Sequence, residues 1–411
     1  MFFALRGENF DGNDYAPKAL AAGADCAVVA ADAGLPDDPR YIKFADPLAT
    51  LRDLAIWHRT HVRGGRLPVL GLTGTNGKTT TKNLIAAVLA RKYRVTATQG
   101  NLNNDIGVPL SLLRIRPDTE FAVIEMGANH PDDIAKLVRV SQPDYGLITN
   151  VGRAHLLGFG SFEGVKAAKG ELYKWLGSHR GSLIFLNEDD DDLRAMAAAQ
   201  PCHVFGYGLD YQGAKILPAT PEEPFLHLQV GEDTVRTHLI GAYNAANVLA
   251  ALAVGEYFGV ERRDAIAAVE SFIPDNNRSQ MMRTAANTLI VDAYNANPSS
   301  MHAALDNFRR IDAPRKLVLL GDMRELGSES LTEHVKIIRQ LRSYSLDACL
   351  VGDEFHRALE ALDSEDIQSA FRWYPDSAAL ADELAAHPVR DTLLLIKGSR
   401  SIQMEKVLDR L

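Results

Sequence analysis

The sequence of 411 residues is poor in cysteine, and it has neither an excess of positive charge nor a long apolar run. Its three cysteines, Cys26, Cys202 and Cys349, stand far apart without metal-ligand spacing, which predicts reduced thiols in a cytoplasmic protein. The net charge of -9 argues against a nucleic-acid partner. No apolar run has the length needed to cross a bilayer, so we expect no membrane insertion. The first residues lack the layout of a signal peptide, so we do not expect export.

The remaining composition, 46% hydrophobic and 24% charged, is ordinary for a globular protein, and the length predicts two or three domains. Strand and helix patterns alternate along 67–282, which predicts a mostly parallel sheet with helices on both faces. A second alternation follows along 283–411, and a short α/β segment occupies 1–66. The fold class is therefore α/β. A predicted strand at 67–72 and a predicted helix at 79–92 enclose the most distinctive stretch of the chain.

That stretch is a glycine-rich turn between a strand and a helix. Gly74 and Gly77 let the backbone approach a phosphate, and the amides at the start of the helix point at the anion. Lys78 is placed to reach terminal phosphates, and Thr79 to offer a hydroxyl to Mg2+. Because position 72 is Leu72 and not glycine, the spacing departs from the common phosphate-loop pattern, and an ordinary turn is the alternative. The strand, lysine and threonine together favour nucleotide binding.

Polar residues stand at the ends of the predicted strands, where ligands gather in parallel sheets. These residues are Thr73, Glu125, Thr149 and Asn150. Glu125 is well placed for Mg2+, a hard cation that prefers oxygen, although a surface carboxylate at a strand end is an alternative. His155 follows the next strand, and the pattern leaves open whether it ligates a metal or makes a structural hydrogen bond.

Asparagine-rich and glycine-bearing clusters follow several other elements. Two of them, 101–109 and 241–247, precede predicted helices, so they present amides to a ligand or simply cap those helices. Three more, 292–298, 321–327 and 397–401, fall at strand ends of the last unit. Turn chemistry explains any one of these three, whereas all three at successive strand ends predict a cleft facing the phosphate loop.

Together these motifs make the chain similar to the Mur ligase family. The Gly-Thr-Asn-Gly-Lys-Thr-Thr loop at 74–80 is the family's loop and accounts for the leucine at position 72. The other motifs resemble those of the branch of the family that adds the dipeptide D-Ala-D-Ala. These motifs are Asn-Leu-Asn-Asn-Asp-Ile-Gly-Val-Pro at 101–109, Glu-Met-Gly-Ala-Asn-His at 125–130, Thr-Asn at 149–150, Ala-His at 154–155, Ala-Lys-Gly-Glu at 168–171, Tyr-Asn-Ala-Asn-Pro at 294–298 and Gly-Asp-Met-Arg-Glu-Leu-Gly at 321–327.

The resemblance implies three domains and a role for each site residue. The domains are an N-terminal domain for a UDP substrate (1–66), a central P-loop ATPase domain with a parallel sheet (67–282) and a C-terminal Rossmann-like domain (283–411). The implied catalytic residues are Lys78, Glu125, His155 and Lys169. The implied ATP-binding residues are Gly74, Thr75, Asn76, Gly77, Lys78, Thr79, Thr80, Asn244, Asn247, Arg278, Asp292 and Asn295. The implied contacts to the other substrates come from Asn103, Asn104, Tyr294 and Asn297.

The implied cofactors are ATP and two Mg2+ ions. Thr79 and Glu125 would bind the first ion, while His155 and a carbamylated Lys169 would help to hold the second. Carbamylation turns a cation into an oxygen ligand, which a metal needs and free lysine does not supply. The implied substrates are UDP-N-acetylmuramoyl-tripeptide and D-Ala-D-Ala, which are joined through an acyl phosphate, and we expect a cytoplasmic monomer.

Two other functions stay open at the level of sequence. One is a different amino-acid ligase on the same scaffold, such as a folylpolyglutamate or cyanophycin synthetase, although the former usually follows the loop lysine with Gly-Ser and this chain has Thr79-Thr80. The other is a non-catalytic ATP-binding regulator, which the presence of Glu125, His155 and Lys169 disfavours. The resemblance also implies a further strand and a nucleotide-binding motif ahead of Phe2 that this sequence lacks, so the way in which UDP is held stays open.

Overall fold

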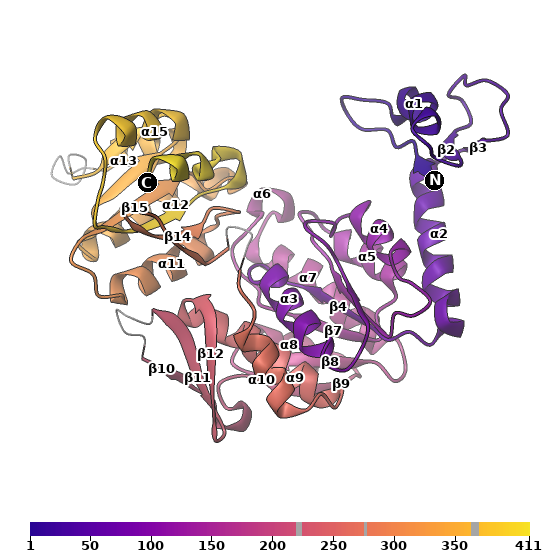
Figure 1. Ribbon diagram of the computed structural model, residues 1–411, viewed down its shortest axis with the longest axis horizontal. Coiled ribbons are helices and arrows are strands. Elements are labelled where there is room, and N and C mark those ends of the chain that lie inside the picture. Colours follow the sequence, from indigo (N-terminus) through magenta and orange to yellow (C-terminus); the bar gives the residue numbers. More distant parts are fainter. Residues whose placement is uncertain (219–223, 275–277, 363–369) are drawn as a thin grey trace.

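The computed structural model describes residues 1–218, 224–274, 278–362 and 370–411, and Figure 1 shows three units that follow one another along the chain. The small N-terminal unit has a parallel sheet in the order β1-β2-β3. Its elements are β1 (Phe2–Phe3), η1 (Gly12–Tyr15), α1 (Ala16–Ala21), β2 (Ala27–Ala30) and β3 (Tyr41–Phe44). Its core holds only a few small side chains, which is too little to support a large independent domain.

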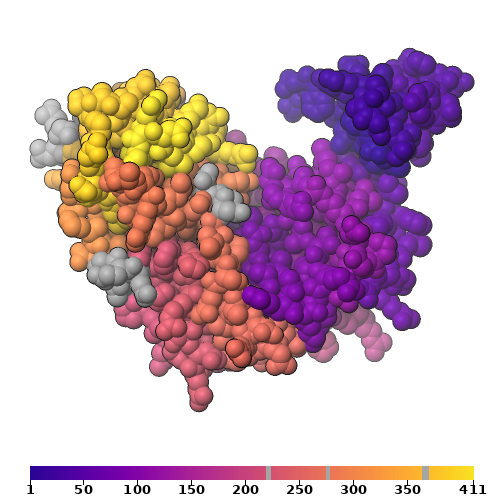
Figure 2. Space-filling view, viewed as in Figure 1, coloured from indigo at the N-terminus to yellow at the C-terminus, as the bar shows by residue number. Residues whose placement is uncertain are grey.

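Helix α2 (Pro47–His61) connects this unit to the rest of the molecule, and η2 (Val62–Gly65) follows it. Asp46 caps the helix by accepting hydrogen bonds from the amides of residues 48 and 49, and Pro47 occupies the first turn. At the other end the buried Arg59 side chain donates to the carbonyls of Ser141 and Gln142 and to the carboxylate of Asp144. The C-terminal part of α2 is thus fixed to the central unit, while Figure 2 shows the indigo N-terminal unit projecting beyond it.

The central unit contains a six-stranded parallel sheet in the order β5-β6-β4-β7-β8-β9, which confirms the predicted α/β class. Its strands are β4 (Val69–Thr73), β5 (Val95–Ala97), β6 (Phe121–Glu125), β7 (Tyr145–Ile148), β8 (Leu183–Asn187) and β9 (His203–Tyr207). Its helices are α3 (Lys78–Leu89), α4 (Gly107–Leu113), α5 (Asp133–Ser141), α6 (Leu156–Phe159), α7 (Phe162–Gly177), α8 (Asp191–Ala198), η3 (Tyr211–Gly213), η4 (Ala242–Asn244), α9 (Ala245–Tyr257) and α10 (Arg262–Glu270).

Successive residues of the central strands point to opposite faces of the sheet. On β6, Phe121 and Val123 pack in the core with α3 and α9, whereas Ala122 and Ile124 pack in the core with α5 and α7. Both faces of the strand are buried, which is why its sequence is continuously apolar until Glu125. Burial of each large apolar side chain contributes about 1.5–3 kcal/mol, so this double-sided core supplies a rigid frame for the loops at the strand ends.

An antiparallel sheet, β10-β11-β12, stands beside the central unit and was not predicted from the sequence. Its strands are β10 (Lys215–Leu217), β11 (Phe225–Val230) and β12 (Asp233–Ile240). Alternate residues of β11 are buried, as expected for a sheet with one covered face. That alternation and the short turn at Gly231 are the sequence features that indicate this hairpin.

The C-terminal unit has the strand order β13-β14-β18-β15-β16-β17, in which only β13 is antiparallel to its neighbour. The strands are β13 (Gln280–Arg283), β14 (Thr288–Asp292), β15 (Lys316–Gly321), β16 (Ala348–Val351), β17 (Arg372–Tyr374) and β18 (Leu393–Lys397). The helices are α11 (Pro298–Arg310), η5 (Gly327–Glu329), α12 (Ser330–Ser343), α13 (Asp353–Glu360), α15 (Ser377–Ala386), η6 (Arg400–Ile402) and η7 (Met404–Arg410).

Two details differ from the sequence-based expectations. From the sequence we expect a final helix that runs to Leu411, whereas the structure has a pair of 3-10 segments, η6 and η7, separated by the left-handed residue Gln403. Strand β13 spans the predicted boundary between residues 282 and 283, and it pairs with β14. Of the predicted linker 272–279, residues 275–277 lie outside the described part of the chain. Within the described ranges, no helix combines the length and apolarity required to traverse a bilayer.

Candidate active site

The turn after β4 is a preformed phosphate loop. Gly77 has a left-handed backbone (φ 78°) and caps α3, so the first amides of that helix face the site. A Cβ on Gly74 (φ 145°) would lie 2.0 Å from Thr149 Oγ1, so only glycine fits there. Asn150, after the neighbouring strand β7, holds the loop in place. Its carbonyl accepts a hydrogen bond from the Thr75 amide, and its side-chain Oδ1 accepts one from the Asn76 amide, both at 3.0 Å.

Lys78 extends back over this loop from the first turn of α3. Its Nζ donates to the carbonyls of Gly74 at 2.8 Å and Thr75 at 3.0 Å. Burial lowers the pKa of Lys78 to about 8, while the carboxylate of Glu125 opposes that shift and the charge of Arg278 reinforces it. A phosphate bound beside this ammonium would favour its charged form, so the geometry suits an anion.

Glu125, at the end of β6, is the carboxylate nearest the loop helix. Its Oε1 accepts from Thr79 Oγ1 at 3.2 Å and from Asn103 Nδ2 at 2.9 Å. Its Oε2 is buried and has no hydrogen-bond partner among the described residues, and the Nζ of Lys82 lies 4.0 Å from it. A buried carboxylate oxygen without a donor is a ready ligand for a hard cation, so the donor set fits Mg2+.

The described residues contain no group of three or more His, Cys, Asp or Glu side chains that could hold a metal ion. A cation beside Glu125 and Thr79 would therefore need further oxygen ligands from a phosphate or from water. Mg2+ is commonly bound in this way, by one or two protein groups together with substrate phosphates.

His155 precedes α6 in a left-handed conformation (φ 53°) and lines the cavity. Its Nδ1 pairs with the carboxylate of Glu325, which comes from the C-terminal unit. The pKa of His155 is lowered, chiefly by burial and also by the charges of Lys78 and Lys169, while the carboxylate of Glu325 opposes that shift. The sequence did not indicate Glu325 as a partner, because 170 residues separate the two side chains.

Lys169, on α7, is 2% exposed, and its Nζ donates to the Ala128 carbonyl at 3.3 Å. Burial lowers its pKa well below the ordinary lysine value, and the nearby charge of Lys78 lowers it further. A lysine in this environment favours the neutral amine, which is the form that reacts with CO2. Lys169 is not among the residues that line the cavity, so its amine lies behind the cavity wall.

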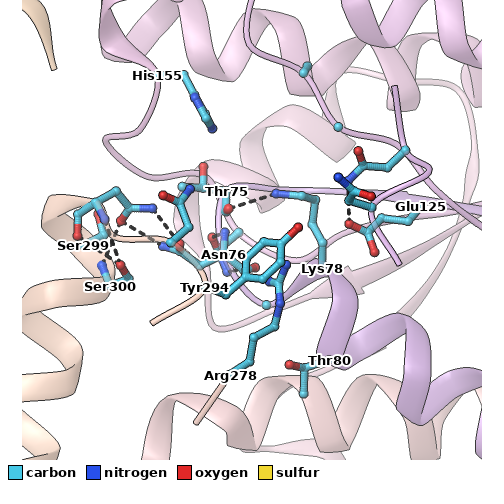
Figure 3. Close-up of a pocket in the computed structure, with 18 of the residues that line it drawn as sticks. Thr75, Asn76, Lys78, Thr80, Glu125, His155, Arg278, Tyr294, Ser299 and Ser300 are labelled. Carbon is cyan, nitrogen blue, oxygen red and sulfur yellow. Dashed lines mark hydrogen bonds between the residues drawn. The ribbon is translucent and has the colours of Figure 1, made fainter. Parts of the chain in front are cut away.

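The C-terminal unit supplies the opposite wall. The guanidinium carbon of Arg278 lies 3.7 Å from the centre of the Tyr294 ring, and its Nε is buried without a hydrogen-bond partner among the described residues. Lys397 forms an ion pair with Asp292. Figure 3 shows Lys78, Tyr294 and Arg278 close together, between Glu125 on one side and α11 on the other.

Two predicted asparagine pairs have structural roles as well as cavity positions. Asn244 donates to the Ile240 carbonyl and accepts from Asn247, which in turn accepts from Thr81 Oγ1 at 2.9 Å. Asn104 Oδ1 accepts from the amide of Gly107, the first residue of α4, whose N-cap residue is Ile106. The sequence left ligand binding and capping open as alternatives for these residues. All four line the cavity, and although Asn244 stands at the N-cap position of α9, its side chain makes no cap bond to that helix.

The cavity between the two units has a volume of about 560 Å3, which is within the range of small-molecule sites. Among the predicted site residues, the structure brings these to its lining: Thr75, Asn76, Gly77, Lys78, Thr80, Asn103, Asn104, Glu125, His155, Asn244, Asn247, Arg278, Asp292, Tyr294, Asn295 and Asn297. It does not bring these to the lining: Gly74, Thr79 and Lys169. Thr79 nevertheless contacts Glu125, and Gly74 shapes the loop from behind.

Family models match the two units that form this cavity. The model described as the Mur ligase middle domain matches residues 72–255, and the one described as the Mur ligase, glutamate ligase domain, matches residues 277–400. The chain belongs to the Mur ligase family. The resemblance predicted from the sequence motifs is thereby confirmed.

Named Mur ligases are similar to this one over nearly its whole length. It is 34% identical to the UDP-N-acetylmuramoyl-tripeptide–D-alanyl-D-alanine ligase of Haemophilus influenzae, over 99% of this chain and 90% of that protein. The ligase of the same name from Bacillus subtilis is 32% identical over 99% of this chain and 89% of its own length. A crystal structure of MurF from Acinetobacter baumannii has a TM-score of 0.84 at 29% identity, covering 99% of this chain and 89% of that one. MurF from Thermotoga maritima in complex with ADP also has a TM-score of 0.84, at 26% identity, over 99% of this chain and 92% of that one.

Lys82 lies next to Glu125 without lining the cavity, and sequence reasoning missed this neighbour of the site. It is 2% exposed and donates to the Thr98 carbonyl at 2.6 Å, close to Glu125. Burial lowers its pKa, and the carboxylate of Glu125 opposes that shift. Its position four residues after Lys78, on the same face of α3, is the pattern that points to it.

Proposed function

We propose that this Mur ligase joins D-Ala-D-Ala to UDP-N-acetylmuramoyl-tripeptide and converts ATP to ADP and phosphate. The observation that carries the proposal is one cavity that combines the phosphate loop, the Glu125 carboxylate and the wall formed by Tyr294 and Arg278. The full-length similarity to ligases of that name supports this choice of substrates over those of a folylpolyglutamate or cyanophycin synthetase. A purely regulatory ATP-binding role is disfavoured because Glu125, Lys78 and His155 all line the same cavity.

The proposed chemistry has two steps. A carboxylate oxygen of the tripeptide attacks the γ-phosphorus of ATP in line, so that a P–O bond forms, the bond to ADP breaks and an acyl phosphate results. The amine of the dipeptide then attacks the acyl carbon, phosphate leaves, and the amine loses a proton as the amide forms. No protein nucleophile is required, and catalysis depends on positioning and on charge neutralisation.

The residues of the cavity fit those two tasks. The amides at the start of α3 and the ammonium of Lys78 face the phosphates of ATP. Arg278, stacked on Tyr294, adds a second cation at the opposite wall. Closure of the C-terminal unit onto the loop excludes water from the acyl phosphate, which would otherwise hydrolyse.

We also propose that Mg2+ accompanies ATP. Thr79 and Glu125 would hold one ion. Glu125 Oε2 supports this assignment because it is buried and has no hydrogen-bond partner in the part of the chain that the structure describes. His155 and a carbamate on Lys169 would help to hold a second, and the lowered pKa of the buried Lys169 amine supports its carbamylation. When bound, these ions neutralise charge on the transferring phosphoryl group.

The domain division 1–66, 67–282 and 283–411, the assignment of UDP to the first of these, a monomeric state and a cytoplasmic location complete the proposal. The family models, which match residues 72–255 and 277–400, support the division between the two larger domains, and the similarity to the named ligases over 99% of the chain supports the assignment of UDP and the location. A sedimentation measurement would test the monomer directly.

The decisive experiment measures phosphate release from ATP in the presence of Mg2+ and bicarbonate. UDP-N-acetylmuramoyl-tripeptide and D-Ala-D-Ala are supplied separately and then together. We expect phosphate release only when both substrates are present. The product should be heavier than UDP-N-acetylmuramoyl-tripeptide by the mass of D-Ala-D-Ala less one water. Release without a heavier product, or binding of ATP without turnover under any combination, would contradict the proposal.

A further inference from the structure

The loop of residues 322–326, which follows β15, brings the C-terminal unit into contact with α6 of the central unit. Its Glu325 carboxylate pairs with Nδ1 of His155, and the Glu325 carbonyl accepts from the Leu157 amide at 3.3 Å. The backbone of Glu325 is left-handed (φ 63°), a conformation that is unfavourable for a residue with a side chain and persists only where neighbouring groups hold it. The contact between the units therefore depends on what fixes residues 322–324.

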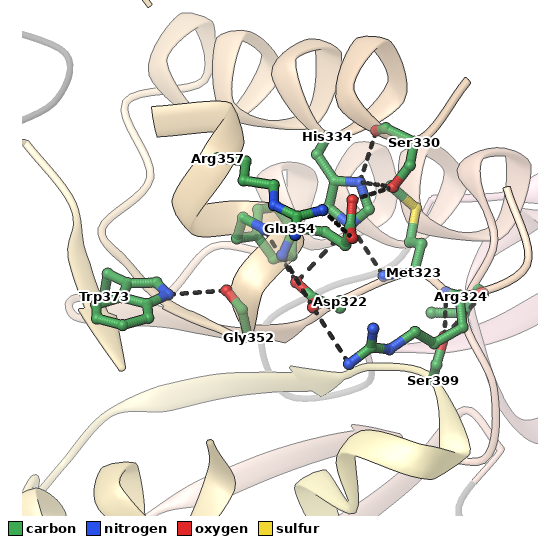
Figure 4. Close-up of polar contacts among 12 residues, drawn as sticks. Asp322, Met323, Arg324, Ser330, His334, Gly352, Glu354, Arg357, Trp373 and Ser399 are labelled. Atoms are coloured by element: carbon green, nitrogen blue, oxygen red, sulfur yellow. Dashed lines mark hydrogen bonds and ion pairs between the residues drawn. The ribbon is translucent and has the colours of Figure 1, made fainter. Parts of the chain in front are cut away.

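His334, on α12, holds the middle of this loop, as Figure 4 shows. Its side chain is fully buried, its Nε2 accepts from the Met323 amide at 3.0 Å, and its Nδ1 lies 2.8 Å from the Ser330 carbonyl oxygen. An amide only donates and a carbonyl only accepts, so Nδ1 carries the ring proton and Nε2 carries none. The two bonds thus require the neutral form of the ring.

The charged groups around His334 leave this ring neutral. Asp322 Oδ1 lies 3.9 Å from His334 Nε2, beyond hydrogen-bond distance, and the Asp322 carboxylate instead accepts from two amides at the start of α13, at 3.1 and 3.0 Å. Burial lowers the pKa of His334, and the charge of Arg324 lowers it further. The Ser330 carbonyl and the carboxylates of Asp322 and Glu354 oppose that shift without reversing it. At neutral pH the ring is therefore free to accept the loop amide.

The amides on either side of Met323 have partners that do not titrate. The amide of the preceding residue donates to a carbonyl of β16 at 3.0 Å, and that of Arg324 donates to Ser399 Oγ at 2.9 Å. Of these three successive amides, only that of Met323 depends on a side chain whose charge changes with pH. A proton on Nε2 of His334 would face the Met323 N–H, so the bond would break two residues ahead of Glu325.

We infer that neutral His334 is a positioning residue for the ligase reaction, because it holds the loop so that the Glu325 carboxylate meets His155. This inference rests on the proposed function. His155 lines the active-site cavity, so the loop acts on the reaction through that ring. As the pH falls, His334 takes up a proton on Nε2 and releases the Met323 amide, and Glu325 loses its place against α6.

Two substitutions at His334 separate the roles of its ring nitrogens. His334→Gln places an amide oxygen near the position of Nε2, so it accepts from Met323 and does not titrate, whereas His334→Asn reaches only the position of Nδ1 and keeps the contact with Ser330 alone. We expect kcat/KM for ATP to stay within about twofold of the unaltered enzyme in the glutamine variant and to fall about tenfold in the asparagine variant, as loss of one buried hydrogen bond implies. His387→Asn, an exposed position after α15, is the matched control and should leave kcat/KM unchanged.

Hydrogen exchange of the Met323 amide supplies a readout that needs no turnover. We expect this amide to exchange about tenfold faster in His334→Asn than in the unaltered protein, and at nearly the unaltered rate in His334→Gln. Binding of ADP and the melting temperature verify that each variant is folded.

The pH dependence isolates the charge of His334. The ratio of kcat/KM of the unaltered enzyme to that of His334→Gln cancels every group that titrates in both proteins. We expect this ratio to be constant above about pH 7 and to fall below about pH 6, as His334 takes up its proton while glutamine does not. A ratio that does not change with pH would overturn the protonation step.

A double substitution shows whether His334 acts through Glu325. In a Glu325→Gln background, His334→Asn should lower kcat/KM by less than about twofold, because the contact through which it acts is already weakened. A full tenfold loss in that background, or equal losses in the glutamine and asparagine variants, would show that His334 only supports the fold of the C-terminal unit.

Faster exchange of the Met323 amide with undiminished kcat/KM would show that the position of the loop does not matter for the reaction, and would overturn the inference alone. An unaltered enzyme that does not ligate the dipeptide would overturn the proposed function instead. The exchange measurement would still show in that case whether His334 holds the loop.

Discussion

Asn76 of the phosphate loop and Asn297 at the start of α11 are paired through their side-chain amides across the cleft. Asn297 Nδ2 donates to Asn76 Oδ1 at 2.8 Å, and the reverse contact measures 3.5 Å. The same Asn297 Oδ1 caps α11 by accepting from the Ser300 amide at 2.9 Å. One side chain therefore stabilises a helix of the C-terminal unit and connects that unit to the nucleotide site.

Substitutions at Asn297 separate these two roles. Asn297→Ser keeps a good N-cap and loses the cross-cleft pair, so kcat/KM for ATP should fall about three- to tenfold while the free energy of unfolding stays nearly constant. Asn297→Ala should lose activity to the same extent and also about 1 kcal/mol of stability. Phosphate-release kinetics and urea unfolding measure the two effects. A serine variant with undiminished kcat/KM would show that the pair is dispensable.

Removing the charge of Glu125 should impair the use of Mg2+. Glu125→Gln should lower kcat by about 100-fold or more, because an amide is a poorer ligand for a hard cation than the carboxylate, whose Oε2 has no hydrogen-bond partner among the described residues. Thermal shift with a non-hydrolysable ATP analogue supplies a readout independent of turnover, since added Mg2+ should stabilise the unaltered protein and not the variant. Glu120→Gln, next to the start of the same strand, is the control. Equal Mg2+ stabilisation of both variants would remove Glu125 from the metal site.

Binding of nucleotide should raise the pKa of Lys78 from about 8, because the phosphates favour the charged ammonium. At pH 8.5 about three-quarters of the Lys78 side chains are neutral before binding, so binding should take up a proton, whereas at pH 6.5 this group is already charged and should take up none. Calorimetry of ADP binding in buffers of different ionisation enthalpy measures the uptake. Lys78→Arg keeps the charge at both pH values, so its uptake at pH 8.5 should disappear. Uptake that persists in this variant would belong to another group.

The buried amine of Lys169 should carry a carbamate when CO2 is present. With 13C-bicarbonate we expect a carbamate carbonyl resonance that is absent from Lys169→Arg and retained in Lys174→Arg, an exposed lysine on the same helix. Because burial lowers the pKa of Lys169 well below its ordinary value, a larger share of this side chain is the reactive neutral amine than in an exposed lysine at the same pH, and the resonance should weaken as the pH falls and the amine becomes protonated. A resonance that survives in Lys169→Arg would arise elsewhere.

The local parts of the fold could be predicted from the sequence. The helix after the phosphate loop was predicted at 79–92 and is Lys78–Leu89, and the apolar strand before Glu125 was placed without error. Both have strong periodicity and clear ends. The hairpin β11–β12 was missed because its exposed face is polar and its signal competes with that of the surrounding α/β pattern.

The site could be predicted only where a motif is continuous in the chain. Lys78, Thr79 and Glu125 stand at strand ends or in the loop itself, and their contacts follow from the sheet. The pairing of His155 with Glu325 depends on how two separately folded units meet, and no periodicity within either unit encodes that distance.

Helix α2 carries the N-terminal unit at its free end, so a small tilt of the helix displaces that unit by a larger distance. Its 15 residues span about 22 Å, and it is fixed to the central unit from Arg52 onwards, through the Arg52–Asp105 ion pair and through Ala55 and Arg59. A tilt of about 5° at that base would move the free end by about 2 Å. The packing of a single small residue such as Ala55 against α4 and α5 is thus magnified into the position of the N-terminal sheet, far from the residue itself.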